Sequence, residues 1–459
     1  MARWLPLLLL LLLLPACTGA GKDSGTPADG PPGRHDPGAF EGVSVSLSEV
    51  IVTVGHLRFT AEGATEAGAW IATPGADDGH AVAAGDGWDT VLFGLKPDTT
   101  YEVRPTAVIG GETVYGDALG LTTGTLPRDV PTASPTLAED GRTPGFLAVG
   151  LVSVDSWALV YDQDGDVVWY YANPHAGTLT SRVARSVDGR SLLVAAAGAV
   201  GSSSDETYIE RVSYDGTRSE SILISGFSHD FCELDDGRIL YIGADRRSFG
   251  GDTLTCDTII ERSPDGDSRE VWNGWDWYDP ADFTDVDTGT EYTHANVLKY
   301  DPDTGLAWLG LRNASSIARV DLATGELVSR FLGTDSDVTL TEGTPTSAQH
   351  SFTLLDDGVV VMDNREDPEE VSRVVQFAID EQAGTARETW AYPSPEGYHL
   401  LGLGDAVRLP DGHTRIVWSS AGQIDELDAD GTLIGRVNLD VGAGYGYGSW
   451  SDDPQALPW

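Results

Sequence analysis

Three histidines occupy equivalent places in the sequence, each at the head of a string that runs to a glycine turn. The strings HDFCELDDG, HANVLKYDPDTG and HSFTLLDDG begin at His229, His294 and His350. A single histidine at the start of a strand is best explained as the cap of a buried strand edge. Three in register, in a chain with only 9 histidines among 459 residues, instead predict one site to which all three imidazoles contribute.

Arginines follow each of these strings on the next expected strand: Arg246, Arg247, Arg312 and Arg365. Each one alone is equally well explained as a solvated charge at a strand end. The cluster stands out because the chain has 72 acidic and 28 basic residues and a formal net charge of -44. Guanidinium and imidazole donors suit the oxygens of a sulfate or phosphate group, so we expect an oxyanion ligand. The same net charge would repel a nucleic acid, which is therefore not an expected partner.

Two series of turn glycines position these residues, because they recur every ~50 residues and alternate with one another. The first series is Gly165, Gly216, Gly266, Gly325, Gly384 and Gly431, and the second is Gly189, Gly237, Gly305, Gly358 and Gly412. Six positions after each glycine of the first series stands an apolar residue: Tyr171, Ile222, Trp272, Phe331, Trp390 or Val437. Alternating turns without helical periodicity indicate four short strands in each unit. Residues 141–459 are therefore predicted to form a six-bladed β-propeller, with the three histidines around one mouth of its central channel.

The N-terminus is typical of an export signal. Residues 1–16 contain a basic start at Arg3, the leucine run Leu7–Leu14, and then Pro and Ala. The string LPAC, which ends at Cys17, resembles a bacterial lipobox and implies a lipid on Cys17; a plain signal peptide ending near Ala16 is the alternative. The absence of Asp at position 18 favours anchoring in the outer membrane of the cell envelope. No later apolar run approaches the ~20 residues that a spanning helix needs, so the lipid is the only expected membrane contact.

The segments between the signal and the propeller differ in composition. Residues 17–40 are rich in Gly, Pro, Asp and Ser and are predicted to be a disordered tether. Residues 41–125 show short alternating runs, and their string LKPDTTYEV, which starts at Leu95, resembles the tyrosine-corner region of a fibronectin type III domain. We therefore expect a small fibronectin/Ig-like β-sandwich without chemistry of its own. Residues 126–140 are predicted to be a Pro-rich linker.

The two cysteines of the folded region predict a disulfide. Cys232 and Cys256 lie 24 positions apart in an exported chain and flank Arg246 and Arg247, although two free thiols are an alternative. Without further cysteines they do not predict a zinc site. Aspartates such as those of the string DQDG, which starts at Asp162, suggest hairpin turns more economically than calcium. We expect no metal and no cofactor.

The histidine strings resemble those of bacterial arylsulfate sulfotransferases. The resemblance rests on the order and spacing of His229, His294, Arg312 and His350, and on Gln349 before the last histidine; it covers residues 145–437. It implies an exported six-bladed propeller that moves a sulfuryl group from an aryl sulfate donor to a phenolic acceptor, without a nucleotide, through a sulfated histidine. It implies that His350 is the nucleophile and that His229, His294 and Arg312 hold the sulfuryl oxygens. The chemistry also needs charge stabilisation, which Arg312 with His294 could supply, and a proton for the leaving phenolate, which His229 could supply. Asn296, Arg246, Arg247 and Arg365 are the expected substrate-binding residues.

Two other functions remain open from the sequence. A non-catalytic surface lipoprotein could combine the same two folded units and bind a polymer or a protein. A quinone-dependent dehydrogenase on a propeller would need calcium and stacked aromatic residues on its axis, and the histidines in register argue against it.

The lipobox generates a prediction. Cys17→Ser removes the thioether that would carry the lipid, so the mature protein should be released from the membrane fraction. Fractionation of cells that express the wild type and the variant, followed by immunodetection, measures this. A processed Cys17→Ser protein that still sediments with membranes would contradict lipid anchoring at this residue.

Overall fold

The computed structural model describes residues 33–75, 79–83, 88–153, 156–198, 207–283, 291–333, 335–440, 442 and 444–452. The predicted signal peptide, Cys17 and most of the predicted tether lie outside these residues. The described chain is all-β apart from four short 3-10 helices: η1 (Pro37–Ala39), η2 (Gly274–Asp276), η3 (Pro280–Phe283) and η4 (Ser419–Ala421). Among the described helices, none has the length and apolar character to cross a membrane.

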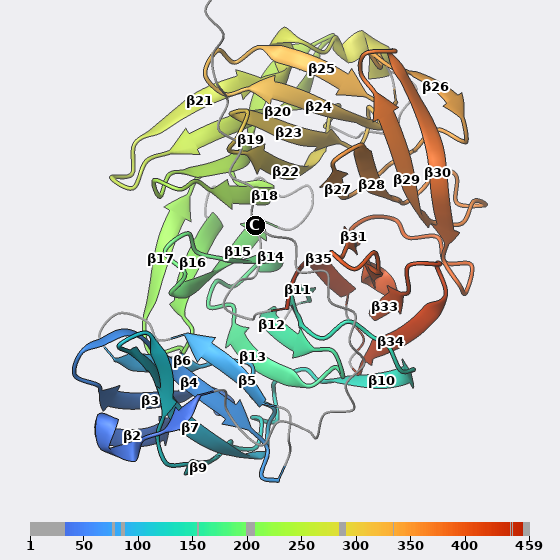
Figure 1. Cartoon of the computed structure of the whole chain (residues 1–459). Coiled ribbons are helices and arrows are strands. Elements are labelled where there is room, and N and C mark those ends of the chain that lie inside the picture. The colour runs from blue at the N-terminus through green and yellow to red at the C-terminus, as the bar shows by residue number, and fades with distance from the viewer. Residues whose placement is uncertain are drawn as a thin grey trace, which may run out of the picture.

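Six sheets, here called blades 1 to 6, surround a central axis in a propeller-like ring (Figure 1). From the axis outward, blade 1 contains β35 (Gly444–Ser451), β11 (Phe146–Val152), β12 (Trp157–Asp162) and β13 (Val167–Ala172). Blade 2 contains β14 (Thr178–Arg185), β15 (Ser191–Gly198), β16 (Thr207–Ser213) and β17 (Ser219–Ile224), and blade 3 contains β18 (Ser228–Glu233), β19 (Ile239–Phe249), β20 (Asp252–Arg262) and β21 (Ser268–Asn273). Blade 4 contains β22 (Ala295–Asp301), β23 (Leu306–Leu311), β24 (Ser316–Asp321) and β25 (Leu327–Phe331).

The last two blades each have a fifth strand at the outer edge. Blade 5 contains β27 (Phe352–Leu355), β28 (Gly358–Asp363), β29 (Arg373–Asp380), β30 (Thr385–Pro393) and β26 (Thr339–Glu342). Blade 6 contains β31 (Asp405–Arg408), β32 (Thr414–Trp418), β33 (Gln423–Leu427), β34 (Leu433–Leu439) and β10 (Ala133–Ala138). The sequence placed residues 126–140 in a linker, but β10 uses them to pair antiparallel with β34, because the outer edge of blade 6 otherwise leaves its backbone groups unpaired.

The turn glycines lie where the repeat predicts them. Every glycine of the first series lies between the third and fourth strands of its blade, and all six have positive φ, from 65° at Gly384 to 98° at Gly266. The second series lies at the turns between the first and second strands of blades 2 to 6, with Gly358 as the first residue of β28. Positive φ is the conformation that glycine adopts without strain, so the glycines fix both hairpins of a blade. The sequence repeat is therefore confirmed.

The ring closes in blade 1, where strands from the two ends of the propeller region meet. β35 pairs antiparallel with β11, from Phe146 opposite Ser451 to Val152 opposite Gly444. β35 is thus the innermost strand of a blade whose other strands are about 300 residues earlier in the sequence. Every innermost strand therefore has a neighbour on its outer side, and no blade is left incomplete.

Two smaller sheets form the N-terminal unit. One contains β2 (Glu41–Leu47), β3 (Gly55–Thr60) and β6 (Asp89–Leu92), and the other β1 (Arg34–His35), β8 (Glu112–Tyr115), β7 (Thr100–Ile109), β4 (Ala64–Ala72) and β5 (Gly79–Ala83), with β9 (Leu119–Thr122) also paired to β7. Leu57 and Phe59 of the first sheet share a core with Ile71 and Val103 of the second. The Tyr101 hydroxyl accepts a hydrogen bond of 2.9 Å from the backbone N–H five residues upstream.

A lysine joins this unit to blade 1. The ammonium of Lys96 lies 3.0, 2.7 and 2.8 Å from carboxylate oxygens of Asp162, Asp164 and Asp166 on the turn between β12 and β13. These three aspartates are also the one group of described residues with the geometry to hold a metal ion. The lysine cation offsets part of their charge, Arg142 pairs with Asp164 at 3.0 Å, and Asp162 additionally accepts backbone N–H groups of its own turn. The cluster therefore acts as a clamp between the two folded units.

The predicted disulfide is wrong, because Cys232 and Cys256 are both free and buried. Cys232 on β18 pairs with Leu240, which pairs with Glu261 on β20, whereas Cys256 lies five residues away from Glu261 along that strand. At ~3.3 Å per residue the offset is about 16 Å, more than twice the ~7 Å limit between the Cα atoms of a disulfide. Burial raises the pKa of both thiols to about 12, so neither is a reactive thiolate.

Candidate active site

The three histidines meet at one mouth of the central axis. The ring centroid of His229 lies 5.0 Å from that of His294 and 6.2 Å from that of His350. Together with Arg312 they line a cavity of about 680 Å³, here called the histidine cavity. The sequence prediction that these four residues converge agrees with their positions in the structure, because each histidine stands at the start of an innermost strand.

Local backbone geometry turns two of the rings toward the axis. His229 has φ of 58° and His294 has φ of 51°, in the left-handed region that non-glycine residues seldom adopt. Such a conformation costs on the order of 1 kcal/mol and persists only where neighbours hold it. Around His294, the buried carboxylate of Asp257 accepts hydrogen bonds from Thr293 Oγ1 (2.5 Å) and from the Ala295 N–H (2.7 Å).

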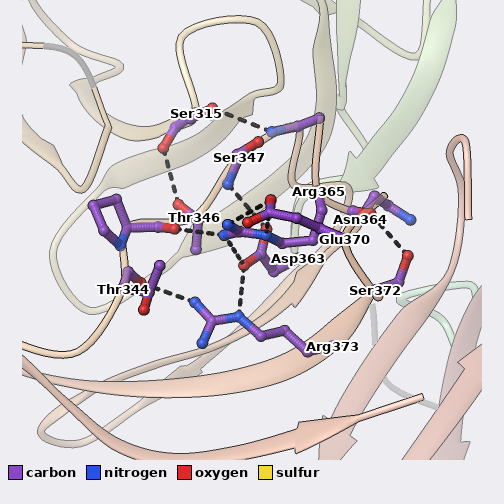
Figure 2. A network of polar contacts seen from close by, with 12 residues as sticks. Ser315, Thr344, Thr346, Ser347, Asp363, Asn364, Arg365, Glu370, Ser372 and Arg373 are labelled. Carbon is purple, nitrogen blue, oxygen red and sulfur yellow. Dashed lines mark hydrogen bonds and ion pairs between the residues drawn. The ribbon is translucent and has the colours of Figure 1, made fainter. Parts of the chain in front are cut away.

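The segment that leads to His350 is held by the polar network in Figure 2. The fully buried Asp363 accepts a hydrogen bond of 2.9 Å from the Ser347 N–H and forms ion pairs of 3.2 Å with Arg365 and 2.9 Å with Arg373. The backbone N–H of His350 donates to Met362 at 3.0 Å. These contacts fix the loop between blades 4 and 5 to β28. The sheet therefore determines where the His350 ring lies.

An aromatic ring and a buried cation lie behind His350. Tyr447 on β35 stacks on the imidazole with a centroid distance of 5.1 Å and an interplanar angle of 23°. The guanidinium of Arg182 lies 4.6 Å from the Tyr447 centroid and is paired with Asp230, and both charged groups are almost completely buried. The stack fixes the plane of the His350 ring from the side opposite to the cavity.

Glu291 and Asn313 support the other polar groups. His294 Nδ1 lies 2.9 Å from the Glu291 carboxylate. Arg312 donates to Asn313 Oδ1 at 2.9 Å, and Asn313 Nδ2 donates to the Glu291 carbonyl at 3.0 Å. The imidazole of His294 and the guanidinium of Arg312 are thus oriented by one connected set of hydrogen bonds.

Burial and mutual repulsion keep two of the imidazoles neutral. Desolvation, with His294 and Arg312 acting in the same direction, lowers the pKa of His229 to about 3. The pKa of His350 is also well below its ordinary value because of burial, with His229, His294 and Arg312 acting in the same direction. The hydrogen bond from His294 lowers the pKa of Glu291, which is therefore a carboxylate. The site combines neutral nitrogen nucleophiles with one imidazole that has an anionic partner.

The other substrate-binding residues expected from the sequence do not line this cavity. Asn296 is fully buried and its amide donates to the Gln349 carbonyl at 2.8 Å, so it positions the backbone before His350. Arg365 is held by Asp363 and, at 2.7 Å, by Glu370. The sequence predicted that Asn296 and Arg365 bind the substrate directly. Their side chains instead bind other protein groups and do not line the histidine cavity.

Arg246 and Arg247 are also absent from the walls of the histidine cavity. Both are exposed on the hairpin of β19 and β20. Arg247 pairs with Asp245 at 2.8 Å and lies 5.3 Å from the centroid of the Trp275 ring. The hairpin continues past the sheet, but Arg246 stays beside the site. It pairs with Thr255, whose backbone bridges to Glu291, and its charge helps to lower the pKa of Glu291.

Three functional neighbours were missed in the sequence. Glu291 stands three residues before His294, and this E-x-x-H spacing was the one available signal for it. Asn313 directly follows Arg312 but belongs to no motif. Tyr447 had no signal, because it lies almost 100 residues after His350 and reaches it only when the ring closes.

The structure is an all-β, propeller-like ring with a cavity at the mouth of its axis that is lined by imidazoles and a guanidinium. The sequence model of the arylsulfotransferase (ASST) family matches residues 146–402, more than half of the chain. The chain belongs to this family and is an aryl-sulfate sulfotransferase, and aryl sulfates are the substrates that the family implies.

Similarity to other known proteins is weak. Streptogramin B lyase is 14% identical with a TM-score of 0.38, over 67% of this chain and 98% of that chain. Virginiamycin B lyase of Staphylococcus aureus is 12% identical with a TM-score of 0.37, over 67% and 88% of the two chains. A hypothetical selenium-binding protein of Sulfolobus tokodaii is 10% identical with a TM-score of 0.40, over 69% and 96%. No curated protein matches the chain.

The depressed pKa of His229 gives a prediction for stability. Above pH 6.5 neither the folded nor the unfolded state protonates this ring, whereas between pH 6.5 and about 3 only the unfolded state does. Acid should therefore destabilise the wild type, and His229 should contribute up to about 1.4 kcal/mol for each pH unit below 6.5. Urea unfolding at pH 7.5 and 5.5 should show a smaller acid loss for His229→Gln than for the wild type. His35→Gln, which removes an exposed histidine, is the matched control; equal acid losses in all three proteins would contradict the prediction.

Proposed function

We propose that this chain is a six-bladed β-propeller enzyme that moves a sulfuryl group from an aryl sulfate to a phenolic acceptor through a sulfated His350, without a nucleotide donor. The observation that carries the proposal is the division of the histidine cavity into two parts. Imidazoles and Arg312 line one part, and apolar side chains line the other: Val152, Leu401, Leu403 and Leu439. Leu401 is 81% exposed, which is unusual for a leucine. An aryl sulfate has the same division, with an anionic group on an aromatic ring.

The first half of the reaction forms a nitrogen–sulfur bond. His350 Nδ1 is buried, which leaves Nε2 as the nitrogen with access to the cavity. Its lone pair attacks the sulfur, the bond from sulfur to the aryl oxygen breaks, and the phenolate leaves with the electron pair. The Arg312 guanidinium stabilises the negative charge on the sulfuryl oxygens. In the second half a phenol oxygen attacks the same sulfur, the nitrogen–sulfur bond breaks, and neutral His350 is restored.

His294 is the better proton donor to the leaving phenolate. The sequence reasoning gave this role to His229, but a ring whose pKa is lowered to about 3 carries no spare proton at neutral pH. The Glu291 carboxylate lies 2.9 Å from His294 Nδ1 and orients that ring in the wall of the cavity, as in other carboxylate–histidine pairs. His294 therefore gives its proton to the phenolate in the first half-reaction and takes one from the acceptor phenol in the second.

The N-terminal part is proposed to tether the enzyme. The signal with its lipobox supports an exported lipoprotein anchored through Cys17 in the cell envelope, most consistent with the outer membrane. The strand order β2-β3-β6 and β8-β7-β4-β5, with the tyrosine-corner hydrogen bond of Tyr101, supports a fibronectin type III-like spacer. A disordered tether before this spacer would hold the propeller away from the lipid surface.

The covalent step predicts a burst. Wild type mixed with excess 4-nitrophenyl sulfate and no acceptor should release about one equivalent of 4-nitrophenol rapidly and carry one sulfuryl group on the peptide that contains His350. His350→Ala should lose both the burst and the turnover, because no other nitrogen replaces Nε2. Rapid-quench kinetics and mass spectrometry at alkaline pH measure the two quantities.

Arg312→Ala is the comparison variant for this experiment. It should keep the sulfuryl acceptor on His350 and lose on the order of 100-fold in turnover, because charge stabilisation is made mainly in the transition state. Full turnover by folded His350→Ala would exclude the mechanism. A folded wild type that turns over none of a broad panel of aryl sulfates would favour the non-catalytic surface lipoprotein.

The proton assignment predicts a leaving-group effect. Glu291→Gln should slow the release of weakly acidic phenols such as 4-methylphenol by 10- to 100-fold or more, on the order of one general acid. Release of 4-nitrophenol, which leaves without a proton, should change little. His229→Gln is the matched variant, and its rates should depend less on the leaving group than those of Glu291→Gln. If His229→Gln shows the larger dependence, His229 is the proton donor.

A further inference from the structure

A second cavity opens at the opposite end of the central axis from the histidines. The later residues of the innermost strands line it: Cys232 of β18, Leu298 of β22, Leu354 of β27, Val407 of β31 and Trp450 of β35. Its volume is about 310 Å³, and we call it the lower cavity. Five of the six blades contribute to it, so it is built by the ring as a whole.

The lower cavity is separate from the site of sulfuryl transfer. The two cavities have no lining residue in common. Between their ends lies the ion pair of Arg182 with Asp230, and Tyr447 covers the guanidinium. All three side chains are almost completely buried. A ligand of the lower cavity therefore has no path along the axis to His350.

One cation in the lower cavity has no partner. Lys299 lies in its wall, and its ammonium makes no hydrogen bond or ion pair with any described residue. Three carboxylates also line the cavity, of which Glu233 pairs with Arg211 and Asp235 is exposed. The third, Asp405, and Asp230 on the axis accept hydrogen bonds from other donors. Asp405 accepts from Ser351 and, at 2.8 and 3.1 Å, from the N–H groups of Ala406 and Gly448.

Asp230, the other axial carboxylate, is engaged in the same way. It binds Arg182 through both oxygens and accepts a hydrogen bond of 2.9 Å from the Leu298 N–H. Burial, together with Arg182, lowers the pKa of Lys299, although the charges of Asp230 and Asp405 act in the opposite direction. An ammonium in such surroundings is stabilised strongly by an anion that brings its own apolar surface.

We propose that the lower cavity is a binding site for a small organic monoanion with an apolar body, whose anionic group pairs with Lys299. Leu234, Leu298, Leu354 and Val407 supply aliphatic walls, and Trp450 supplies an aromatic face. The size of the cavity is at the lower end for ligand sites, which suits a molecule of one or two rings. The site is independent of the sulfuryl chemistry in the histidine cavity.

Calorimetric titration with 2-naphthoate tests this site, because this carboxylate has no sulfuryl group to transfer. Arg312→Met, whose histidine cavity has lost its guanidinium, should bind about one equivalent. Lys299→Met in this background should weaken that binding by about 10-fold or more, the usual effect of removing a charge-assisted hydrogen bond. Lys299→Arg in the same background keeps the charge and should stay within a few-fold of Arg312→Met. Lys299→Met alone should retain sulfotransferase turnover.

Other outcomes overturn the proposal. They are no binding of 2-naphthoate to Arg312→Met, or equal affinity of Arg312→Met with and without Lys299→Met. Thermal unfolding checks that each variant is folded, and Lys299→Gln, which keeps a polar side chain of similar length, replaces Lys299→Met if the methionine variant does not fold.

Discussion

The pairing of β35 with β11 is the constraint on which the rest of the structure depends. A ring of sheets holds its shape only when the first and last blades are joined, and here the backbone hydrogen bonds of blade 1 make that join. The same strand brings Tyr447 against His350 and the Gly448 N–H to Asp405. Closure of the ring therefore completes the fold. It also brings residues of β35 into contact with His350 at one end of the central axis and with Asp405 at the other.

The histidine side chains are positioned by loops that are fixed to rigid sheets. Two histidines hold left-handed backbone conformations, and buried carboxylates bind the backbone beside His294 and before His350. Strain of this kind is stable only because each loop connects two blades that cannot move apart. The catalytic geometry is thus derived from the scaffold, and the imidazoles need little reorganisation when a substrate binds.

Charge is distributed unevenly over this acidic protein. With a formal net charge of -44, an anionic substrate is repelled from most of the surface, so the guanidinium of Arg312 and the imidazoles provide the local attraction. Inside the ring, Arg182 and Asp230 neutralise one another and separate the two cavities. Lys299 makes no direct ion pair, although Asp230 and Asp405 act on it electrostatically, and it lines only the second cavity.

Sequence alone determined the repeat and the convergence of the histidines. Both follow from local rules, since a turn glycine with positive φ fixes a hairpin and equivalent positions in a repeat occupy equivalent positions around an axis. His229, His294, Arg312 and His350 could be found in this way. The turn spacing could not show that Arg246 and Arg247 stand on a hairpin extension and do not line the cavity, because the length of a hairpin beyond its sheet is not encoded in that spacing.

Only the tertiary structure decided which side chains face one another across the ring. In the folded chain Cys232 and Cys256 are unpaired, and Arg365 pairs with carboxylates. Tyr447 stacks on His350, although almost 100 residues separate them in the sequence. These contacts depend on register, on closure and on which of two faces a strand turns to the axis. A sequence pattern with a period of two residues leaves that choice of face open, and packing against the neighbouring blades makes it.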